Sequence, residues 1–426
     1  MDLREVLRGG PHKEIGSDVD PYLEAAGISA ADQRTAWIAG VKGHPGYRMA
    51  GNVLSTREAV ARAMGTTVEK IPDIINEAVG KTMACQLVDT PAYYREVPLS
   101  EIPLPTYYRT DGGPYVTSGI FHAGYDGRFN LSYHRMMRMK GDRFAIRVVP
   151  RHLNALLREA GENGDDLPAV VSIGSDAAFM IAGSLSVCFG QDEMGIASSI
   201  NHRMTGEPLR VFSPGGDPDG PKAPVGTEIV MLGRITNERV PEGPFVDITS
   251  TLDLSGMGPG EPVFEVDRVM VREEPIVHVL LPGGYEHYMM MGLPKEPSIM
   301  RSVRKVVPLV HAVRLTEGGC CWLHGIVSIT KQKEGDGKNA IMAAFTGHPS
   351  MKMVTVVDGD IDIFDDRQVE WAVATRFQAD RDLTIIRNAR GSTLDPSSHE
   401  GDGTTSKMGI DATMPLKGRE PFLRVK

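Results

Sequence analysis

The chain is poor in cysteine. Only Cys85, Cys188, Cys320 and Cys321 occur among its 426 residues. No two of them form a CxxC pair, and the adjacent Cys320 and Cys321 cannot form an ordinary bridge with each other. A disulfide framework is therefore not expected, and the scarcity of cysteine predicts a reduced, intracellular protein.

Long apolar runs and an excess of positive charge are also missing. No stretch approaches the roughly 18 uninterrupted apolar residues of a membrane-spanning helix, and the start MDLREVLRGG contains no apolar signal core. We therefore expect a cytoplasmic protein without a membrane partner. The formal net charge is −9, whereas nucleic-acid binding needs a basic surface, so no nucleic-acid partner is expected.

The common catalytic and binding motifs are absent. The sequence has no GxGxxG that opens a helix after a strand, and no GxxxxGK[ST], HExxH or GxSxG. The run DGDIDIFDDRQVE resembles a calcium loop only at its start, because Ile363 and Val369 stand where that loop requires Gly and Glu. We interpret this run as a strand end followed by a helix cap.

The chain is longer than one hydrophobic core usually covers, so two or three domains are expected. The N-terminal part begins with a helical pattern in which Thr56 is a candidate N-cap and Pro72 marks a break or a second helix start. From about residue 115 to 295 the pattern changes to strands, among them PAVVSIGS, TEIVMLGRI and EPIVHVLLPG. Many strands with Gly-rich turns, including a hairpin turn at 140–142, predict a β-barrel or β-sandwich.

The last third of the chain has a different pattern. A strand is predicted at 351–358, a helix at 365–377 with Asp365 as a candidate N-cap, and a second strand at 382–388. This order of elements predicts a β-α-β unit, and hence a parallel sheet in a C-terminal α/β domain.

One acidic pair stands out in the central part. The stretch EGPFVD places Glu242 and Asp247 five residues apart around a Gly-Pro turn. Pro244 excludes a helix interior, and Gly243 permits a chain reversal that aims both groups into one cavity. Paired carboxylates in one cavity titrate apart, as acid–base chemistry requires. The alternative is a solvated loop, which is common for acidic residues beside Gly and Pro.

A second polar segment spans residues 128–152, RFNLSYHRMMRMKGDRFAIRVVPRH. Polar and apolar side chains alternate from Asn130 to Arg135, and His152 closes the second strand. Downstream, FGQDEMGIA contributes Glu193. Asn, His and Glu together offer oxygen and nitrogen ligands for a divalent cation. The alternative is a half-exposed hairpin with solvated Arg and His side chains.

Several separate segments together resemble the UbiD family of reversible decarboxylases, which use prenylated FMN. They are NLSYHR, VVPRH, DEMGIA, GEP, EGPF-x-D, GHPSMKMVTVVDGDIDIFD and ATRFQADRDLTIIRNARGSTLDPSS. The resemblance covers most of the chain, and EGPF-x-D combined with NxSxxR is its most specific part. It implies a multidomain α/β (α+β) fold: an N-terminal α/β region (1–105), a central split β-barrel that binds the flavin (106–300), and a C-terminal α/β domain (301–426) for oligomerisation and part of the active site.

The resemblance also implies the catalytic residues. A Glu-Arg-Glu type triad carries over as Arg135, Glu242 and Asp247, with Asp in place of the last Glu. The implied reaction is a non-oxidative, reversible decarboxylation on the modified flavin. Arg135 would hold a carboxylate in a bidentate clamp, Glu242 would protonate the product after carbon dioxide leaves, and Asp247 would tune Glu242 by like-charge coupling.

The resemblance places a divalent metal, Mn²⁺ or Mg²⁺, between the flavin phosphate and the protein, with K⁺ nearby. The metal ligands carried over are Asn130, His152 and Glu193. The cofactor contacts carried over are these three together with Ser132, Tyr133, His134, Arg135, Arg151, Ser184 and Lys352. Arg151 stands where the family often has Gln. A local cation suits a phosphate dianion in an acidic protein.

The segment GGYEHYMMMG resembles the variable substrate-side loop of the family, so His287 and Met289 are candidate substrate contacts. Mobile Met side chains suit a flat apolar ring, and we therefore expect an aromatic or heteroaromatic carboxylic acid. Core packing of these Met residues is an alternative. The other substrate class is an α,β-unsaturated aliphatic acid such as an anhydromevalonate phosphate, which would need a basic cluster for its phosphate.

The expected partners are a small carboxylic acid and carbon dioxide, a flavin prenyltransferase that supplies the cofactor, and further copies of the chain in a homodimer or larger oligomer. Two other function classes stay open. One is a flavin-binding oxidoreductase on the same barrel, which EGPFVD and Arg135 disfavour because hydride transfer needs no acid pair. The other is a non-catalytic carboxylase subunit.

Overall fold

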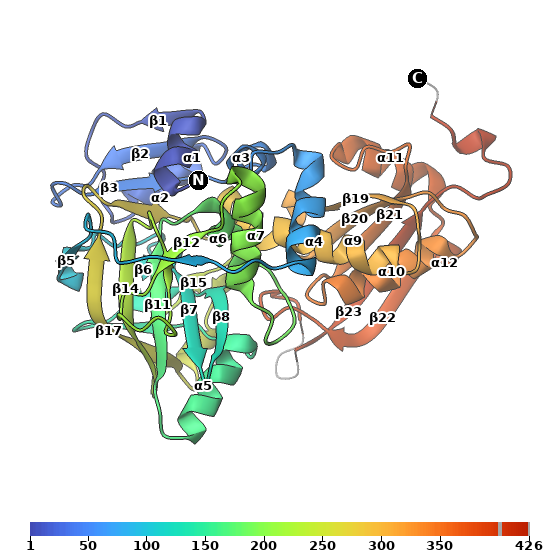
Figure 1. Ribbon diagram of the computed structural model, residues 1–426. Helices are drawn as coiled ribbons and strands as arrows, with labels where there is room; N and C mark the ends of the chain where they lie inside the picture. The colour runs from blue at the N-terminus through green and yellow to red at the C-terminus, as the bar shows by residue number, and fades with distance from the viewer. Residues whose placement is uncertain (399–402, 425–426) are drawn as a thin grey trace. The chain divides into compact units, whose positions relative to one another are not determined.

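The computed structural model of the protein describes residues 1–398 and 403–424 (Figure 1). The chain forms two compact units, Met1–Met290 and Met291–Lys426. Within the described ranges, no helix combines the length and the hydrophobicity that a membrane span requires. The division into three domains at residues 105 and 300 stays a prediction.

A four-stranded sheet forms the N-terminal layer of the first unit. Its order is β1-β2-β3-β18, and the strands are β1 (His12–Glu14), β2 (Ala36–Gly40), β3 (Arg48–Gly51) and β18 (Ile276–Val279). β18 runs parallel to β3. The strand in EPIVHVLLPG was predicted for the barrel, which is wrong: its partner is β3, because the apolar pattern of a strand shows that it is buried but not which strand it pairs with.

Short helices accompany this layer: α1 (Leu3–Gly9), α2 (Glu24–Ala31), α3 (Arg57–Ala63) and α4 (Ile71–Gly80). The Thr56 side chain accepts a hydrogen bond from the Ala59 amide at the start of α3, so the predicted N-cap is confirmed. α4 begins with Pro72 in its first turn, as the sequence predicts, because proline lacks the amide hydrogen that is unused there.

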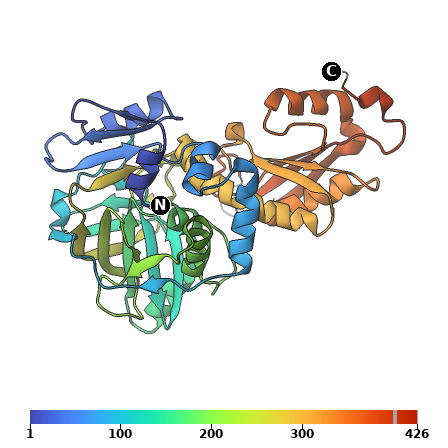
Figure 2. The ribbon, with the colours of Figure 1, turned by 45° about the horizontal axis from the view of Figure 1, so that its top comes forward.

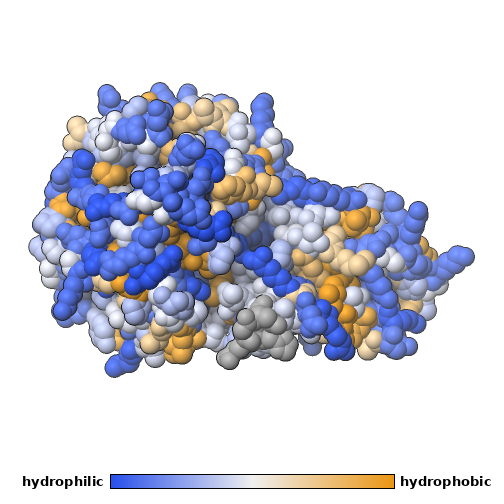
Figure 3. All heavy atoms as spheres, turned by 90° about the horizontal axis from the view of Figure 1, so that it is seen from below, coloured by the Kyte–Doolittle hydropathy of each residue, from blue (hydrophilic) through white to orange (hydrophobic). Residues whose placement is uncertain are grey.

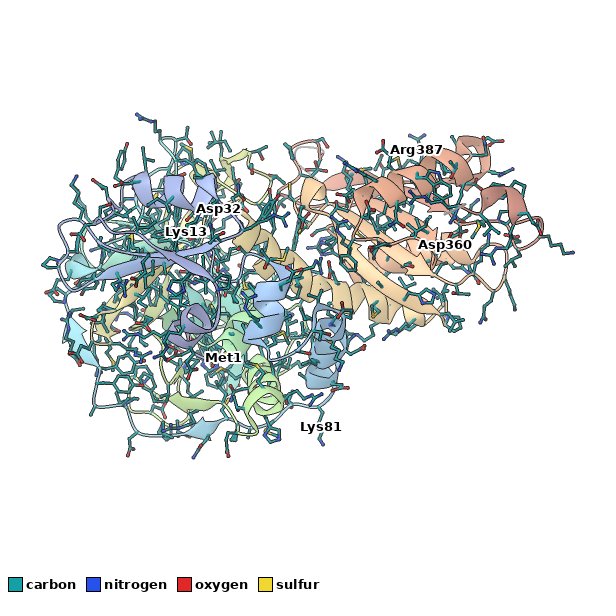
Figure 4. All side chains as sticks on the ribbon, turned by 90° about the horizontal axis from the view of Figure 1, so that it is seen from above. Met1, Lys13, Asp32, Lys81, Asp360 and Arg387 are labelled. Atoms are coloured by element: carbon teal, nitrogen blue, oxygen red, sulfur yellow. The ribbon has the colours of Figure 1, made fainter. Side chains whose placement is uncertain are left out.

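The surface of the first unit is polar and carries exposed ion pairs. Lys13 Nζ and Asp32 Oδ2 lie 2.7 Å apart and join β1 to the end of α2 (Figure 4). On the face seen in Figure 3, hydrophobic residues are scattered among hydrophilic ones. Because solvent screens such exposed pairs, the buried core stabilises the fold more than they do.

A curled antiparallel sheet is the centre of the first unit (Figure 1). Its order is β6-β9-β10-β17-β14-β11-β7-β8, with β5 paired to β17. The strands are β5 (Arg95–Val97), β6 (Tyr115–Val116), β7 (Ile120–Tyr125), β8 (Arg128–Tyr133), β9 (Met136–Arg138), β10 (Arg143–Ile146), β11 (Leu167–Ile173), β14 (Ile229–Val240) and β17 (Glu261–Val271). The predicted split β-barrel and the hairpin turn at 140–142 between β9 and β10 are confirmed.

The curl has a local cause in the two longest strands. The register between β14 and β17 shifts at Leu232/Gly233 and at Thr236/Arg239, and such bulges bend and twist a sheet. At Gly233 a Cβ would lie 2.0 Å from the Glu265 carbonyl oxygen, so only glycine fits there. The core inside the curl contains Phe121, Phe144 and Phe264, each fully buried.

Helices α5 (His152–Glu162), α6 (Ala177–Ala182) and α7 (Glu193–Thr205) flank the sheet. α5 packs on β7, β8, β11 and β14, and α7 packs on α4, α6 and β8. The apolar side of α5 is formed by Leu153, Leu156, Leu157 and Ala160, the spacing of an amphipathic helix. The remaining elements of this part are β4 (Gln86–Leu87), β12 (Arg210–Phe212), β13 (Ala223–Pro224), β15 (Phe245–Val246), β16 (Leu252–Asp253) and α8 (Tyr285–Gly292).

The second unit is a five-stranded sheet between helices (Figure 2). Its order is β19-β20-β21-β23-β22, from β19 (Val310–Leu315), β20 (His324–Ile329), β21 (Met353–Asp358), β22 (Leu383–Arg390) and β23 (Thr404–Ala412). The helices are α9 (Glu296–Arg304), α10 (Asp336–Gly347), α11 (Asp366–Arg376) and α12 (Ala379–Asp382). Gly409 of β23 faces Ile341 of α10, whereas Ala412 packs with α11. Alternate residues of a strand point to opposite faces, so the two helices cover opposite faces.

The predicted β-α-β unit is wrong in its pairing. The strands β21 and β22 and the helix α11 with its N-cap Asp365 are present as predicted. However, the parallel neighbours of β21 are β20 and β23, and β22 lies beyond β23 as an antiparallel edge strand. Residues of β22 are mostly exposed or half-buried, as suits an edge. The sequence analysis did not identify β23, which lies between β21 and β22.

Candidate functional site

Arg135 lies between β8 and β9 and binds three carboxylates. Its Nε and Nη2 donate to the two oxygens of Glu242 at 2.7 and 2.8 Å. Nη1 donates to Asp247 at 2.5 Å, and Nη2 also donates to Asp253 at 2.9 Å. The structure therefore brings Glu242 and Asp247 together on one guanidinium, in the bidentate geometry that strengthens such hydrogen bonds.

A short hairpin presents these acids. β15 and β16 pair antiparallel, with Phe245 opposite Asp253. Side chains of residues i and i+2 and of directly opposed residues share one face of a hairpin, so Phe245, Asp247 and Asp253 point the same way. The Arg135 guanidinium lies over the Phe245 ring at 4.4 Å from its centroid. Phe245 and Val246 of EGPFVD thus form a strand of this pair, and Glu242 is fully buried, so the stretch is not a solvated loop.

Two glycines allow close approach at this hairpin. A Cβ on Gly243 would lie 2.5 Å from the Cα of Gly112, and the Gly112 amide donates to the Pro244 carbonyl at 2.9 Å. A Cβ on Gly256 would lie 2.5 Å from Glu242 Oε2. Gly243 was predicted to permit a chain reversal. Gly243 has no left-handed backbone angle. Glycine is needed at this position because the backbone of Gly112 approaches it closely.

Burial shapes the electrostatics of the cluster. Glu242 is fully buried, and burial raises its pKa above the usual value more than the Arg135 contact lowers it. Burial also opposes the charged form of Asp253, but Arg135 and the Ser255 hydrogen bonds reverse this and hold its pKa below the usual value. Burial lowers the pKa of Arg135, and Glu242, Asp247 and Asp253 more than compensate, so it stays charged.

A second cluster contains the predicted metal ligands. Asn130 on β8 donates through Nδ2 to Glu193 Oε1 at 3.1 Å, and His152 Nδ1 lies 3.8 Å from the same oxygen. Burial raises the pKa of Glu193 to about 7, and burial lowers that of His152. Within the described ranges no group of three His, Cys, Asp or Glu side chains has a metal-binding arrangement. The set brought together here is one amide, one imidazole and one carboxylate.

Two helix N-termini meet at this cluster. His152 is the first residue of α5, and Glu193 is the first residue of α7. Free backbone amides and the helix dipole make an N-terminus favourable for anions. The cluster thus combines amide groups that suit a phosphate with a carboxylate and an imidazole that suit a cation.

The other predicted cofactor residues of the first unit lie around β8 and α6. Ser132 Oγ donates to Asn130 Oδ1 at 2.7 Å and lies 2.8 Å from His134 Nε2. The Tyr133 hydroxyl is buried and has no hydrogen-bond partner among the residues that the structure describes. Ser184 is buried and donates to the Ile181 carbonyl at 2.8 Å. The Arg151 side chain reaches Ser186 at 3.5 Å.

The remaining predictions lie elsewhere. The predicted substrate-side loop is wrong in form: residues 285–292 are the helix α8, in which Met289 is 3% exposed. His287 Nδ1 accepts from the Gly283 amide at 3.1 Å, and burial lowers its pKa, with Asp247 and Arg135 also acting on it. Lys352 lies in the second unit, 2.9 Å from Asp395.

Sequence reasoning missed Asp253. Asp253 lies in the stretch LDLSG, which matches no known motif, and an aspartate between two leucines resembles an ordinary loop residue. The signal that identifies it is its position opposite Phe245 in the hairpin. Register between short strands depends on tertiary packing, so the sequence alone does not show this position.

Comparison with protein families connects nearly the whole chain to one group. Models of three domains of 3-octaprenyl-4-hydroxybenzoate carboxy-lyase match it: the N-terminal domain over residues 5–79, the Rift-related domain over 78–285 and the C-terminal domain over 288–412. The chain is 42% identical over 416 residues to the anhydromevalonate phosphate decarboxylase of Methanothermobacter thermautotrophicus, covering 96% of each protein. It is 28% identical to the gallate decarboxylase of Lactiplantibacillus plantarum, covering 100% of this chain and 96% of that one.

Solved structures of the same class are similar to this chain over its whole length. The UbiD-class enzyme HmfF from Pelotomaculum thermopropionicum, in complex with FMN, superimposes with a TM-score of 0.92 at 36% identity and covers 100% of this chain and 97% of its own. An evolved dimeric form of HmfF in complex with prenylated FMN gives a TM-score of 0.88 at 34% identity, with 100% and 96% covered.

Proposed function

The chain belongs to the UbiD family of decarboxylases, and we propose that it binds prenylated FMN and decarboxylates an unsaturated carboxylic acid with Arg135, Glu242 and Asp247 as its catalytic residues. The single observation that carries this proposal is the buried bidentate pair of Arg135 and Glu242, with Asp247 on the third nitrogen. The modified flavin, when bound, supplies the electron sink for loss of carbon dioxide.

The cluster at the two helix N-termini fits the phosphate end of the cofactor. Glu193 is a buried carboxylate with the His152 imidazole 3.8 Å away, and burial lowers the pKa of this imidazole and so favours its uncharged form. A divalent ion would supply the missing positive charge, with Asn130, His152 and Glu193 as its oxygen and nitrogen ligands. We propose that Mn²⁺ or Mg²⁺ would bind there and would neutralise charge on the cofactor phosphate, with K⁺ nearby.

Glu242 suits the role of proton donor. Its raised pKa keeps a larger fraction of the side chain protonated near neutral pH than an exposed glutamate would have. Arg135 binds both Glu242 oxygens and so fixes the orientation of the carboxyl group. Asp247 holds the opposite end of the same guanidinium, and its charge keeps Arg135 in place.

The first candidate substrate is a phosphorylated α,β-unsaturated acid of the anhydromevalonate phosphate type. It is supported by the 42% identity to a decarboxylase of that name over nearly the whole chain, against 28% for gallate decarboxylase. An aromatic or heteroaromatic acid is the second candidate. His287 favours this aromatic candidate because an imidazole can bind a polar substituent of a ring. The charges of Asp247 and Arg135 affect the pKa of His287, so this side chain lies near the acidic cluster.

A substrate panel separates these two candidates. Protein produced together with a flavin prenyltransferase is expected to release carbon dioxide from anhydromevalonate phosphate faster than from the same acid without phosphate or from aromatic and furan carboxylic acids. Isotope release from carboxyl-labelled substrates measures this. Faster turnover of an aromatic acid would make the second candidate correct, and protein made without the prenyltransferase is the control.

We also propose that the chain forms a homodimer or a larger homo-oligomer in the cytoplasm and depends on a flavin prenyltransferase for its cofactor. Light scattering on a size-exclusion column is expected to give at least twice the chain mass of 46.3 kDa. One solved structure of the relative HmfF is that of an evolved dimeric form, which supports self-association in this fold. A single species of one chain mass at micromolar concentration would contradict the prediction.

A further inference from the structure

A small cavity lies in the N-terminal layer of the first unit, where α1 packs against α3 (Figure 1). Its volume is about 90 Å³, well above the roughly 10–15 Å³ that one water molecule needs. Residues of α1, β2 and α3 line it together with residues of the connecting segments. None of the residues predicted for catalysis or for binding of metal, flavin or substrate is among them, so the cavity is not part of the proposed active site.

The lining of this cavity combines apolar and positively charged side chains. Leu7 and Val53 contribute apolar groups, whereas Arg34 and Arg62 contribute charge, and no acidic side chain of the described residues belongs to the lining. Thr56 adds a hydroxyl group whose oxygen accepts from a backbone amide of α3, so its hydrogen can be donated to a ligand. Such a lining suits an anion that carries a short hydrocarbon part.

Arg62 is exposed in the last turn of α3, and its guanidinium lies against the backbone of Gly10. A Cβ on Gly10 would lie 3.0 Å from Nη2 and 3.3 Å from Nε of Arg62, so a larger residue would crowd this side chain. Among the residues that the structure describes, Arg62 has no ion-pair partner and no side-chain hydrogen bond. Its donors are therefore available to a ligand in the cavity, and an anion there would replace only water.

The second arginine connects the cavity with α8. The Arg34 guanidinium lies over the Tyr285 ring, 4.9 Å from its centroid, and the neighbouring Gln33 accepts from the Tyr285 amide at 3.1 Å. One residue beyond the lining, the Leu54 amide donates to Glu286 Oε1 at 2.8 Å. Two segments of the chain beside the cavity thus hold the first turn of α8.

We propose that this cavity binds the phosphate group of a small phosphate monoester between Arg34 and Arg62, and that its occupancy stabilises the first turn of α8. Two guanidinium groups balance the charge of a phosphate dianion, and their forked N–H donors match its oxygens in bidentate pairs. A carboxylate offers only one negative charge to the two groups and is expected to bind more weakly. The apolar part of the lining accommodates a short hydrocarbon chain on the phosphate.

The link to α8 follows from the position of Arg34 between the cavity and Tyr285. A phosphate that binds the guanidinium restricts the motion of Arg34 and so favours its contact with the Tyr285 ring. Coupling of this kind is reciprocal, so a more ordered α8 also raises the affinity for phosphate. His287, two residues beyond Tyr285, lies near the acidic cluster, so occupancy of the cavity can influence the proposed active site. Phosphate binding itself does not depend on the proposed reaction.

Isothermal titration calorimetry on the flavin-loaded full chain tests the binding, with inorganic phosphate and butyl phosphate as probes and butanol as the uncharged control. Butyl phosphate is expected to bind at one site per chain and more tightly than inorganic phosphate. Arg62→Gln is expected to weaken it by about tenfold or more, the usual loss for a hydrogen bond to a charged group. Arg62→Lys is expected to weaken it less, because lysine keeps the charge but not the fork.

The matched control is Arg8→Gln, which removes an exposed charge in the last turn of α1 outside the lining and should bind butyl phosphate like the parent. Equal affinity of the parent and Arg62→Gln overturns the proposed site. His152→Ala separates the cavity from the proposed cofactor cluster, and binding should persist in it. If binding is lost in His152→Ala and kept in Arg62→Gln, the probe binds at the cofactor cluster and the cavity is not the site.

Hydrogen–deuterium exchange of the peptide that covers residues 283–290 tests the link to α8. Butyl phosphate is expected to slow this exchange in the parent protein and in Arg8→Gln, but not in Arg62→Gln. A merely structural role of Arg62 would change the exchange to the same extent with and without the probe. Tight binding without slower exchange at 283–290 overturns the link to α8.

Discussion

Replacing Glu242 by Gln is expected to reduce turnover by about two to four orders of magnitude, the usual contribution of a general acid. Glutamine keeps the size of the side chain, and its amide oxygen can still accept from Arg135, so binding of the cofactor and substrate should persist. What is lost is the carboxylic proton. Steady-state carbon dioxide release by the cofactor-loaded variant, with flavin content measured from its absorbance spectrum, checks this.

Asp247→Asn is the comparison for this result. Asp247 binds one nitrogen of Arg135 and leaves the bidentate pair with Glu242 in place, so its loss is expected to cost less turnover. If Asp247→Asn is inactive while Glu242→Gln is nearly normal, the two roles are reversed. If both variants are normal, the acid pair does not take part in the reaction. Deuterium incorporation into the product from heavy water follows the same proton independently.

His152→Ala is expected to remove flavin from the purified protein almost completely while leaving the fold intact. The imidazole lies 3.8 Å from Glu193 Oε1 near the N-termini of α5 and α7, where it would be a ligand of the proposed divalent ion. Loss of one of three protein ligands should lower the affinity for the metal ion, and therefore for the flavin phosphate. The decrease should be far larger than the roughly 10- to 100-fold loss of affinity seen when a residue that hydrogen-bonds to a metal ligand is removed.

The absorbance ratio of flavin to protein and the metal content measure the effect of His152→Ala, and circular dichroism checks the fold. His202→Ala is the matched control, because His202 is an exposed residue of α7 at the end opposite Glu193. Glu193→Gln should resemble His152→Ala, since it removes the only anionic ligand without changing the size of the side chain. Full flavin occupancy in metal-stripped His152→Ala protein would refute the assignment of this cluster.

Local patterns in the sequence determined several elements of the secondary structure. The caps at Thr56 and Asp365, the helix start at Pro72 and the hairpin turn at 140–142 follow from side chains that bind their own neighbouring backbone or from the backbone preferences of Pro and Gly. Such effects reach only a few residues along the chain. They are therefore visible in the sequence without knowledge of the tertiary structure.

The family motifs determined the candidate residues in the same way. NLSYHR and EGPFVD identify Arg135, Glu242 and Asp247 before any geometry is known, and the structure places all three in one cluster. The sequence could not show that Gly243 and Gly112 lie in backbone contact, because residues so far apart along the chain approach each other only after the barrel has folded.

Tertiary structure decided the pairing of strands and the composition of the acidic cluster. β18 joins the N-terminal sheet, β23 separates β21 from β22, and the hairpin register places Asp253 opposite Phe245. In each case an alternating or apolar pattern shows which residues are buried, while the partner is chosen by packing across the whole core. The sequence thus specified the chemical groups of the site, and the fold determined that three carboxylates, rather than two, share one guanidinium.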